Sequence, residues 1–218
     1  IGRRKPGEGA LGQVYTALHG PTHIQYALKR LRPELLAEPE RLARLRRQAP
    51  QWALLRHPNL VSLVDWEAQA PGPAFLVSEC VEAERLSDVL ARRERPSSLE
   101  EALELCRQVG AALLCLHSAG VLHGALHPGN IFVTTGAQGE RCYRVSDFGL
   151  AWLLQGPPGS PPAGLSVITA SYLSPEQARG ETRHLDGRCD QFALAALCYE
   201  LLAGRPAFRQ PNDDLKTV

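Results

Sequence analysis

Three glycines near the start of the chain have the spacing of a phosphate-binding loop. Gly7, Gly9 and Gly12 fit the pattern G-x-G-x-x-G, and Val14 follows. Glycines let backbone N–H groups approach phosphate oxygens closely, because no side chain stands in the way. Lys29 lies farther along the chain, and it is one of only three lysines among 24 basic residues. We interpret the glycines as a phosphate loop and note the isolated lysine.

The residues after Gly12 separate two meanings of this glycine pattern. A dinucleotide-binding Rossmann turn must open a helix, so that the helix N-terminus meets the phosphates. Here residues 13–18 alternate like a strand, and residues 25–30 form a second strand after a turn at Gly20 and Pro21. The pattern therefore favours a β-hairpin that covers phosphates, with Lys29 on its second strand.

The helix expected after Glu38 carries an interruption. Buried-type residues recur at helical spacing, and arginines at 41, 44, 46 and 47 supply its charge. Pro50 removes one backbone donor and clashes with the carbonyl of Arg46, at a cost of about 3 kcal/mol in a helix interior. We expect a kink or an early end near Ala49. The apolar stripe is formed by Leu42, Leu45, Ala49 and Trp52.

The rest of the chain is mostly helical. Strands are expected at 60–66 and 74–78, and a short hairpin at 131–133 and 143–145. A capping box at 98–101 predicts a long amphipathic helix, and residues 190–203, apolar almost all round, predict a buried helix. Four prolines and three glycines at 155–164 predict a mobile loop. A strand-rich start and a helical remainder indicate two unlike lobes.

Composition and charge exclude several classes of protein. The chain is 44% hydrophobic and 22% charged, which excludes collagen-like and wholly disordered chains. The net charge of +1 argues against a nucleic-acid binder, and the longest apolar run, at 192–199, cannot span a membrane. Residues 1–60 hold 11 basic and 4 acidic residues, whereas the rest holds 13 and 19. The two parts should therefore attract each other or different partners.

The cysteines and histidines have no metal-site spacing. No two of the six cysteines lie within four residues of each other, which excludes zinc-ribbon and C-x-x-C motifs. We expect reduced, mostly buried thiols in a cytoplasmic protein. His123 and His127 could share a metal on a helix, but Gly124 and Pro128 disfavour a helix there.

Seven motifs in order, from Gly7 to Phe208, resemble those of the protein-kinase family. The chain is similar to the bacterial eukaryote-like Ser/Thr kinases. This resemblance implies an α+β, two-lobed protein-kinase fold, with an antiparallel-sheet N-lobe at 1–80 and a mainly helical C-lobe at 81–218. The C-lobe ends soon after its buried helix, so we expect a piece of a longer protein. Beside the glycine motif, the motifs are Y-A-L-K at 26–29, H-P-N-L-V at 57–61, E-C-V at 79–81, D-F-G at 147–149, Y-L-S-P-E-Q-A-R-G at 172–180, and Y-E-L-L-A-G-R-P at 199–206 after Asp190.

The resemblance also implies a site for ATP and Mg²⁺ between the lobes. The glycine backbone and Lys29 would contact phosphates, apolar residues would enclose the adenine, and the hinge backbone would hydrogen-bond its edge. Carboxylate and amide oxygens suit Mg²⁺. The implied ATP residues are Gly7, Gly9, Gly12, Val14, Ala27, Lys29, Glu79, Val81, Phe132 and Asp147, and the implied metal ligands are Asn130 and Asp147.

Structural roles for the same residues stay open. Lys29 could pair with Asp147 in an empty cleft and neutralise both charges. Asp147 and Phe148 could serve only to anchor packing. Asn130 could brace its own loop by bonding to the backbone, as Asn commonly does in turns.

The loop that carries the catalytic residues in the family is altered here. The motif H-R-D-x-x-x-x-N reads H-G-A-L-H-P-G-N at 123–130, so Ala125 stands at the position of the catalytic Asp. Alanine cannot accept the proton of a substrate hydroxyl, a role worth roughly 10²- to 10⁴-fold in rate. Gly124 replaces an Arg that binds an activation-loop phosphate, and His127 replaces a Lys near the γ-phosphate.

The helix after Lys29 and the activation loop are altered as well. Gln48 stands where the family has the Glu that pairs with the lysine, and an amide brings no counter-charge. Ile168 replaces a Gly, and the loop before it offers only Ser160 and Ser166 as hydroxyls. We do not expect phosphorylation to order this loop.

Together these losses predict a pseudokinase with no catalytic residues. It would be a regulatory or scaffolding module that binds protein partners or other domains of a longer chain, and that keeps an ATP site without efficient phosphotransfer. The alternative is a weak or unconventional ATP-dependent transferase of the Ser/Thr-kinase type.

Overall fold

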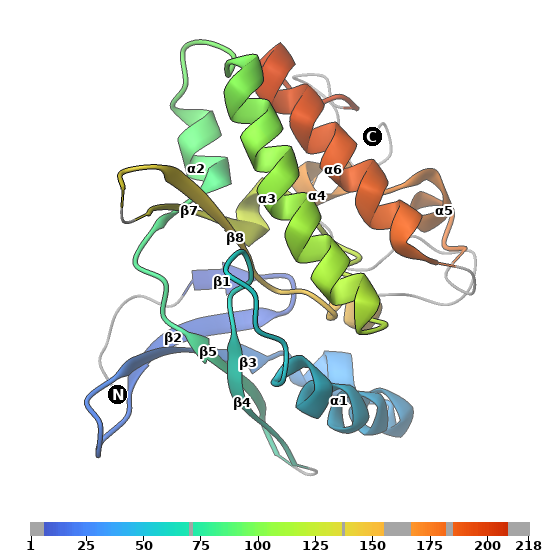
Figure 1. Cartoon of the computed structure of the whole chain (residues 1–218). Helices are drawn as coiled ribbons and strands as arrows, with labels where there is room; N and C mark the ends of the chain where they lie inside the picture. Colours follow the sequence, from blue (N-terminus) through green and yellow to red (C-terminus); the bar gives the residue numbers. More distant parts are fainter. Residues whose placement is uncertain (1–6, 70–71, 137, 155–166, 182–184, 209–218) are drawn as a thin grey trace. The chain divides into compact units, whose positions relative to one another are not determined.

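The structure is a computed structural model that describes residues 7–69, 72–136, 138–154, 167–181 and 185–208. The chain divides into two compact units: residues 1–57 with 61–82, and residues 58–60 with 83–218. Figure 1 shows strands and a helix in the first unit and mainly helices in the second. The boundaries expected for the two lobes, 1–80 and 81–218, remain a prediction.

The first unit contains a five-stranded antiparallel sheet with the order β1-β2-β3-β5-β4. The two expected strands after the glycines are confirmed as β2 and β3, whose register pairs Gly12 with Leu31 and Leu18 with Gln25. The elements of this unit are β1 (Gly7–Gly9), β2 (Gly12–Leu18), β3 (Gln25–Leu31), the 3-10 helix η1 (Pro33–Leu36), α1 (Pro39–Trp52), β4 (Leu63–Ala68) and β5 (Ala74–Glu79).

Helix α1 does not end where its proline predicted. It continues past Pro50 to Trp52, so the expected early end near Ala49 is wrong. The proline lies in the last turn, where it disturbs few later hydrogen bonds. Ala49 is fully buried and Trp52 is 2% exposed, and burying a large apolar side chain contributes about 1.5–3 kcal/mol. Packing of this face therefore offsets the local cost of the proline.

The second unit combines helices with a three-stranded sheet of order β6-β7-β8. Helix α3 begins at the expected cap, where the Ser98 side chain accepts a hydrogen bond from the Glu101 N–H at 3.1 Å. The expected hairpin is confirmed as β7 and β8. The elements are β6 (Glu84–Arg85), α2 (Leu86–Ala91), α3 (Leu99–Ser118), η2 (Pro128–Asn130), β7 (Ile131–Thr135), β8 (Arg141–Val145), η3 (Ala151–Leu154), α4 (Val167–Ala170), α5 (Pro175–Ala178) and α6 (Gly187–Ala203).

Residues 58–60 belong to the second unit, which shortens the strand expected at 60–66. Asn59 Nδ2 donates to Gln108 Oε1 at 2.8 Å and to the Tyr143 carbonyl at 2.9 Å. The Val145 N–H donates to the Asn59 carbonyl at 2.8 Å. These bonds hold the backbone of 59 and 60 against β8, so β4 begins only at Leu63.

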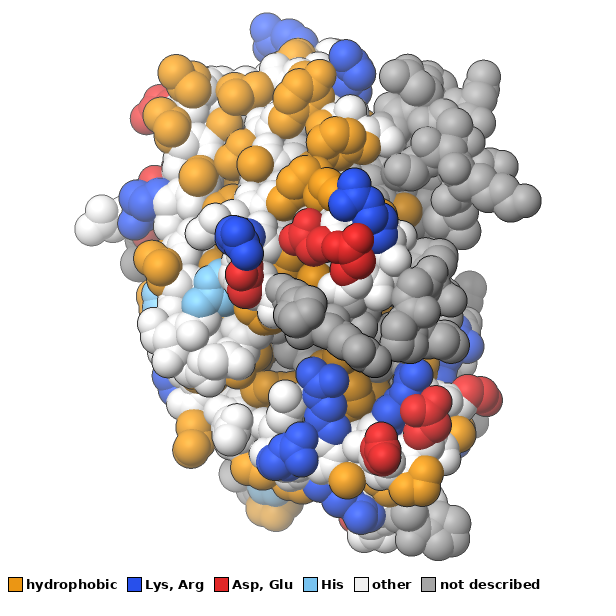
Figure 2. Space-filling view, turned by 90° about the vertical axis from the view of Figure 1, so that its right-hand side faces the viewer, with side chains coloured by type: hydrophobic (Ala, Val, Ile, Leu, Met, Phe, Trp, Pro, Cys, Tyr) orange, Lys and Arg blue, Asp and Glu red, His pale blue; other side chains and the backbone are white. Residues whose placement is uncertain are grey.

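Helix α6 is longer and less buried than its composition predicted. It begins at Gly187, where the Asp186 side chain caps the Arg188 N–H, and ends before Gly204, which has a φ of 69°. Tyr199 is 42% and Leu202 is 45% exposed, so burial on all sides is wrong. Figure 2 shows hydrophobic side chains gathered at the height of α3 and α6 in Figure 1. The loop expected to be mobile at 155–164, with Ser160 and Ser166, lies outside the described residues.

Candidate functional site

The glycine motif forms the turn of a β-hairpin, as the sequence predicted. Gly7 pairs with Val14 and Gly9 with Gly12 across β1 and β2. A Cβ placed on Gly12 would lie 1.9 Å from the carbonyl oxygen of Arg30, and the φ of Gly12 is 149°. By contrast, nothing lies within 4 Å of a Cβ placed on Gly9. The fold itself thus requires Gly12, whereas it leaves Gly9 free for another use.

The sheet brings three of the proposed nucleotide residues onto one face. Val14 is the direct cross-strand partner of Lys29, and Ala27 lies two residues before Lys29 on β3. Side chains of directly paired residues, and of residues two apart, point to the same side of a sheet. Val14, Ala27 and Lys29 are each partly exposed. This face therefore offers an amine beside two small apolar side chains.

The end of β5 is held to the segment before β4. The Glu79 N–H donates to the Ser62 carbonyl at 3.1 Å, and Glu79 Oε1 accepts from the Ser62 N–H at 2.6 Å. The N–H of Glu79 is therefore occupied within the fold. Any hydrogen bond from Glu79 to an adenine edge would have to use its carbonyl instead.

Gln48 lies among arginines on α1. Its Oε1 accepts a hydrogen bond from Arg44 Nε at 3.3 Å, one helical turn earlier. Burial, and then the charge of Arg47, lower the pKa of the Arg44 guanidinium. Blue side chains gather at the height of α1 in Figure 2. An amide at position 48 adds no negative charge to this helix, where a glutamate would add one beside Arg44.

The loop at 123–130 is held by one buried carboxylate from α6. Asp190, which is 1% exposed, accepts hydrogen bonds from the N–H of His123 at 2.9 Å and from the N–H of Gly124 at 2.7 Å. His117 Nε2 on α3 donates to Asp190 Oδ2 at 2.8 Å. From α5, Gln177 Nε2 donates to the Gly124 carbonyl at 2.6 Å. These bonds fix the backbone immediately before Ala125.

Position 125 itself is braced but carries no functional group. Asn130 Nδ2 donates to the Ala125 carbonyl at 3.0 Å, and the Ala125 N–H donates to His123 Nδ1 at 3.3 Å. The bracing role expected for Asn130 is therefore confirmed. Ser146 N–H donates to the Asn130 carbonyl at 2.8 Å, which ties the loop to the segment before Asp147.

His127 is fixed in one tautomer by its own loop. Its Nδ1 accepts a hydrogen bond from the Gly129 N–H at 3.1 Å. A neutral imidazole that accepts at Nδ1 carries its proton on Nε2. A Cβ on Gly129 would lie 2.7 Å from His127 Cε1, so the ring and the glycine fit each other. In this state Nε2 can donate to an anion but cannot accept a proton.

His123 is a neutral, structural residue. It is completely buried, and burial lowers its pKa, against the opposing effect of the Asp190 and Asp147 charges. Its Nδ1 is used by the Ala125 N–H, so the proton lies on Nε2. Among the described residues, no hydrogen-bond partner reaches Nε2. This geometry indicates a packed, structural role for His123.

The D-F-G segment has an unusual backbone. Asp147 has a φ of 62°, in the left-handed region that non-glycine residues rarely adopt. On either side of it, Ser146 N–H bonds to the Asn130 carbonyl and Gly149 N–H to the Leu122 carbonyl. Phe148 is 6% exposed. The loop bonds and the buried ring thus hold Asp147 in a costly conformation, which is often a mark of a functional position.

The side-chain oxygens of Asn130 and Asp147 suit magnesium more than a transition metal. Asn130 keeps its side-chain oxygen after its amide nitrogen bonds Ala125, and Asp147 is a carboxylate. Mg²⁺ is commonly held by one or two carboxylates together with substrate phosphates, so it needs no dedicated protein cage. Within the described ranges, no group of three or more His, Cys, Asp or Glu side chains could hold a metal by itself. Asn130 and Asp147 are therefore compatible with a nucleotide-bound Mg²⁺.

Phe132, which was assigned to the adenine, lies on β7 beneath an arginine. The Arg85 guanidinium carbon lies 4.9 Å from the centre of the Phe132 ring. A cation over an aromatic face is attracted by the ring quadrupole. Arg85 also hydrogen-bonds the Gly129 carbonyl. Arg85 thus connects the proposed adenine residue to the loop at 123–130.

Two positioning residues escaped prediction from the sequence. Asp190 was recognised only as part of a motif, and Gln177 only as a letter in the segment 172–180. A charged residue in the first turn of an apolar helix indicates that Asp190 has a hydrogen-bonding partner inside the fold. That partner, the N–H of His123, lies 67 residues away along the chain, so the sequence does not reveal it.

None of the described helices has the length and apolar character needed to cross a membrane. Comparison with known proteins agrees with the two-part architecture of strands and helices. The family model described as the protein kinase domain matches residues 3–217. The serine/threonine-protein kinases PknA and PknF of Mycobacterium tuberculosis are each 35% identical, over 92% and 96% of this chain and 46% and 44% of their own length. The crystal structure of the Mycobacterium tuberculosis PknI kinase domain is 29% identical, with a TM-score of 0.74, over 95% of this chain and 76% of that one.

These comparisons confirm the α+β protein-kinase fold and the resemblance to bacterial Ser/Thr kinases. The chain spans less than half the length of the PknA and PknF proteins that it matches. The comparisons test neither the assignment of individual site residues nor the loss of phosphotransfer. The chain belongs to the protein kinase domain family.

Proposed function

We propose that this kinase domain binds ATP but does not transfer its phosphoryl group efficiently, and that it acts as a regulatory module. One observation carries the proposal: the loop at 123–130 is fully built, yet Ala125 presents a methyl group at the position of the base. Asp190, Gln177 and Asn130 all hold the backbone around this position. The loss therefore concerns the reacting group and not the folding of the loop.

No neighbouring side chain in this loop replaces the missing carboxylate. His127 Nδ1 accepts from the Gly129 N–H, so in the neutral ring Nε2 already carries a proton. His123 is buried and its pKa is lowered. A general base must reach the substrate hydroxyl in an unprotonated form. Neither imidazole meets both conditions.

The nucleotide part of the proposal rests on the face of the β2–β3 sheet. Lys29 would contact phosphates, with Val14 and Ala27 beside the base, and the glycine hairpin would bring backbone N–H groups to the phosphates. Asp147 and Asn130 would hold Mg²⁺, which would neutralise the phosphate charge when bound. Of these residues, Gly12 and Asn130 are also needed by the fold, because Gly12 lies against the Arg30 carbonyl and Asn130 bonds the Ala125 carbonyl. Lys29 is therefore the residue whose replacement tests binding most cleanly.

An active transferase is the second candidate, and the comparisons favour it. PknA and PknF are named as serine/threonine-protein kinases, and the similarity covers nearly the whole of this chain. Such a transferase would need its substrate hydroxyl to lose a proton without a carboxylate at position 125. The phosphoryl-transfer transition state is largely dissociative, so a slow rate without a base is chemically reasonable. The two candidates differ in measurable rate.

The deciding experiment measures phosphate incorporation from γ-labelled ATP with Mg²⁺, with autophosphorylation and a basic protein as acceptors. We expect the wild-type chain to match an Asp147→Ala variant, because neither would have a working site. Incorporation at least tenfold above that variant would overturn the proposal and support the transferase. Parallel reactions with α-labelled ATP would detect nucleotidyl transfer.

A separate experiment tests nucleotide binding. Thermal unfolding with and without ATP and Mg²⁺ should show a higher midpoint with nucleotide for the wild type and no shift for Lys29→Ala. Arg30→Ala is the matched control, since Arg30 is exposed and points to the opposite side of the same strand. An equal shift in wild type and Lys29→Ala would disprove the phosphate role of Lys29. If ATP shifts the unfolding midpoint of neither the wild type nor the variants, the domain does not bind the nucleotide and acts as a purely structural scaffold.

A further inference from the structure

Helices α3 and α6 pack as an antiparallel pair whose register is fixed at two points. At one end, a Cβ on Gly187 would lie 2.8 Å from the ring of His117. Farther along, a Cβ on Gly110 would lie 3.8 Å from Leu194 Cδ2. Seven residues backward on α3 are thus matched by seven residues forward on α6. Residues that continue this register should face each other.

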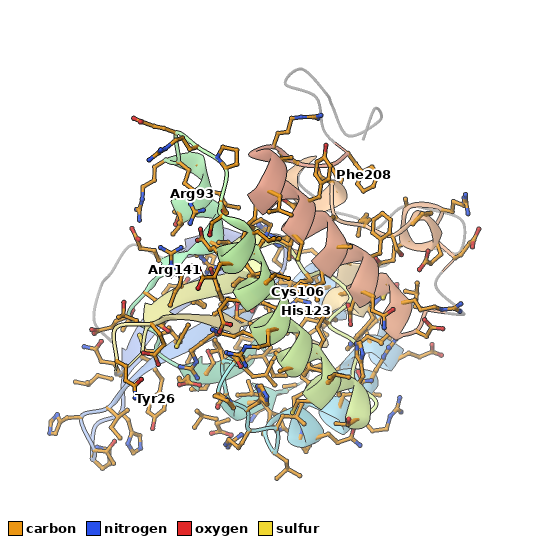
Figure 3. All side chains as sticks on the ribbon, turned by 45° about the horizontal axis from the view of Figure 1, so that its top comes forward. Tyr26, Arg93, Cys106, His123, Arg141 and Phe208 are labelled. Atoms are coloured by element: carbon orange, nitrogen blue, oxygen red, sulfur yellow. The ribbon has the colours of Figure 1, made fainter. Side chains whose placement is uncertain are left out.

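Four residues farther along the same register, two cysteines meet. The step from Gly110 leads to Cys106, and the step from Leu194 leads to Cys198. The register set by Gly187 and Gly110 therefore places these two positions opposite each other, and Cys106 is near enough to raise the pKa of Cys198. Both are reduced, with Cys106 exposed and Cys198 partly buried. Figure 3 labels Cys106 on α3, on the side toward α6.

We propose that Cys106 and Cys198 form an oxidative modification site, at which a hydroperoxide such as H₂O₂ converts the two thiols into a disulfide that joins α3 to α6. This site is independent of the proposed nucleotide function. Antiparallel helices in contact at a glycine one turn away can bring Cα atoms to the 4.4–6.8 Å separation that a disulfide needs.

The reaction balances in two steps. The Cys106 thiolate attacks one peroxide oxygen, so that an S–O bond forms, the O–O bond breaks, and the departing hydroxide takes up a proton to become water. The Cys198 sulfur then attacks the Cys106 sulfur, so that an S–S bond forms and the S–O bond breaks. The second hydroxide leaves as water with the proton of Cys198. Two thiols and one peroxide thus give one disulfide and two waters.

The surroundings of the two thiols assign them different roles. Cys106 is the exposed one, which a peroxide can reach directly. Burial, and then the neighbouring Cys106, raise the pKa of Cys198 to about 12, so at neutral pH this thiol stays protonated and is not the one that attacks the peroxide. Once Cys106 has become a sulfenic acid, its sulfur is electrophilic, and the Cys198 sulfur can attack it while the proton of Cys198 leaves with the hydroxide. Cys106 is therefore the attacked residue and Cys198 resolves the intermediate.

The disulfide would act on the helices that support the loop at 123–130. His117 on α3 and Asp190 on α6 bond each other at 2.8 Å, and Asp190 holds the N–H groups of His123 and Gly124. A cross-link that closes a loop of about 90 residues removes much of the freedom of the unfolded chain. The midpoint of thermal unfolding should rise by roughly 5–15 °C, and amide exchange at His123 and Gly124 should slow.

The test treats the whole chain with a small molar excess of H₂O₂, blocks remaining thiols, and maps peptides by mass spectrometry without reduction. We expect one cross-linked peptide pair containing Cys106 and Cys198, and a higher unfolding midpoint that dithiothreitol reverses. Cys198→Ser should stop at the sulfenic or sulfinic acid of Cys106, with no shift in midpoint. Cys115→Ser, also on α3 but on another side, should behave as the wild type.

Three results would overturn the assignment. They are a wild-type chain that yields only over-oxidised Cys106, a cross-link between two chains, and a cross-link that survives in Cys198→Ser. If Cys106→Ser and Cys198→Ser both fail to fold, cross-linking of the wild type at stoichiometric peroxide, read by peptide mapping alone, still decides the question.

Discussion

The β2–β3 sheet face and the loop at 123–130 differ in which parts of a kinase site they keep. On the sheet face the side chains expected to contact a nucleotide are present, and Val14, Ala27 and Lys29 lie on one side. In the loop the scaffold is present, since Asp190 and Asn130 hold its backbone, but the reacting group is a methyl. One region keeps its chemistry and the other keeps only its shape.

The difference shows which retained residues are informative. Gly12 is demanded by the close approach of the Arg30 carbonyl, and Asp190 by the buried N–H groups that it satisfies. Their presence would follow from folding alone. The strand register alone does not require a lysine at position 29, because a strand accepts many side chains at a partly exposed position. A lysine there, in a chain whose other basic residues are nearly all arginine, is the residue that the proposed phosphate role uses.

The largest effect should come from restoring the missing carboxylate. If the loop keeps only its shape, Ala125→Asp together with Gln48→Glu should raise phosphate incorporation from γ-labelled ATP by roughly 10²- to 10⁴-fold. The aspartate would supply the base, and the glutamate would supply the counter-charge among the arginines of α1. Incorporation rates measured against the wild type give the ratio.

Asp147→Ala added to that double variant is the control, and it should abolish the gain. A double variant that folds with the wild-type midpoint but shows no gain would mean that the loop has lost more than its side chain. His127, fixed by Gly129, would then be the next position to restore.

The scaffold of the loop should fail when its carboxylate is removed. Asp190→Ala leaves two buried N–H groups and His117 without their acceptor, which costs about 3–5 kcal/mol of unfolding free energy. Asp186→Ala is the control on the same helix, since Asp186 is an exposed cap of Arg188. Urea unfolding measures both variants. A cost below about 1 kcal/mol for Asp190→Ala would show that the loop is held by other contacts.

Much of this comparison could be predicted from the sequence, and the failures have physical causes. Strand alternation and caps are local signals, so β2, β3 and the start of α3 at Ser98 were predicted correctly. The continuation of α1 past Pro50 depends on how Trp52 packs, which no local pattern contains. The role of Asp190 depends on N–H groups more than 60 residues away. The exposure of Tyr199 depends on what surrounds α6.

The glycines of the hairpin should separate stability from binding. Gly12→Ala would force a Cβ to within 1.9 Å of a carbonyl oxygen at a positive φ, and we expect a loss of about 2–4 kcal/mol. Gly9→Ala meets nothing within 4 Å, so its stability should stay within about 0.5 kcal/mol of the wild type. Chemical denaturation measures the first difference. The ATP-induced shift in unfolding midpoint should still fall for Gly9→Ala, and an unchanged shift would remove Gly9 from the nucleotide site.

The smallest effect should be a pH dependence that comes from the buried loop. Burial lowers the pKa of His123 below the value of about 6.5 that it has in an unfolded chain. The folded state therefore binds fewer protons than the unfolded state once the pH falls below about 6.5. Stability from this residue is complete above that pH, and it is lost as the pH falls toward the lowered pKa.

The measurement compares the unfolding free energy of the wild type and of His123→Asn at pH 7.5 and at pH 5.5. Asn can still accept the Ala125 N–H, but it cannot titrate. The wild type should lose more stability on acidification than the variant, and His23→Asn, at an exposed position, should keep the wild-type difference. Equal losses in wild type and His123→Asn would mean that the loop opens to water at low pH. That result would contradict a rigid scaffold around Ala125, and with it the contrast between a sheet face that keeps its chemistry and a loop that keeps only its shape.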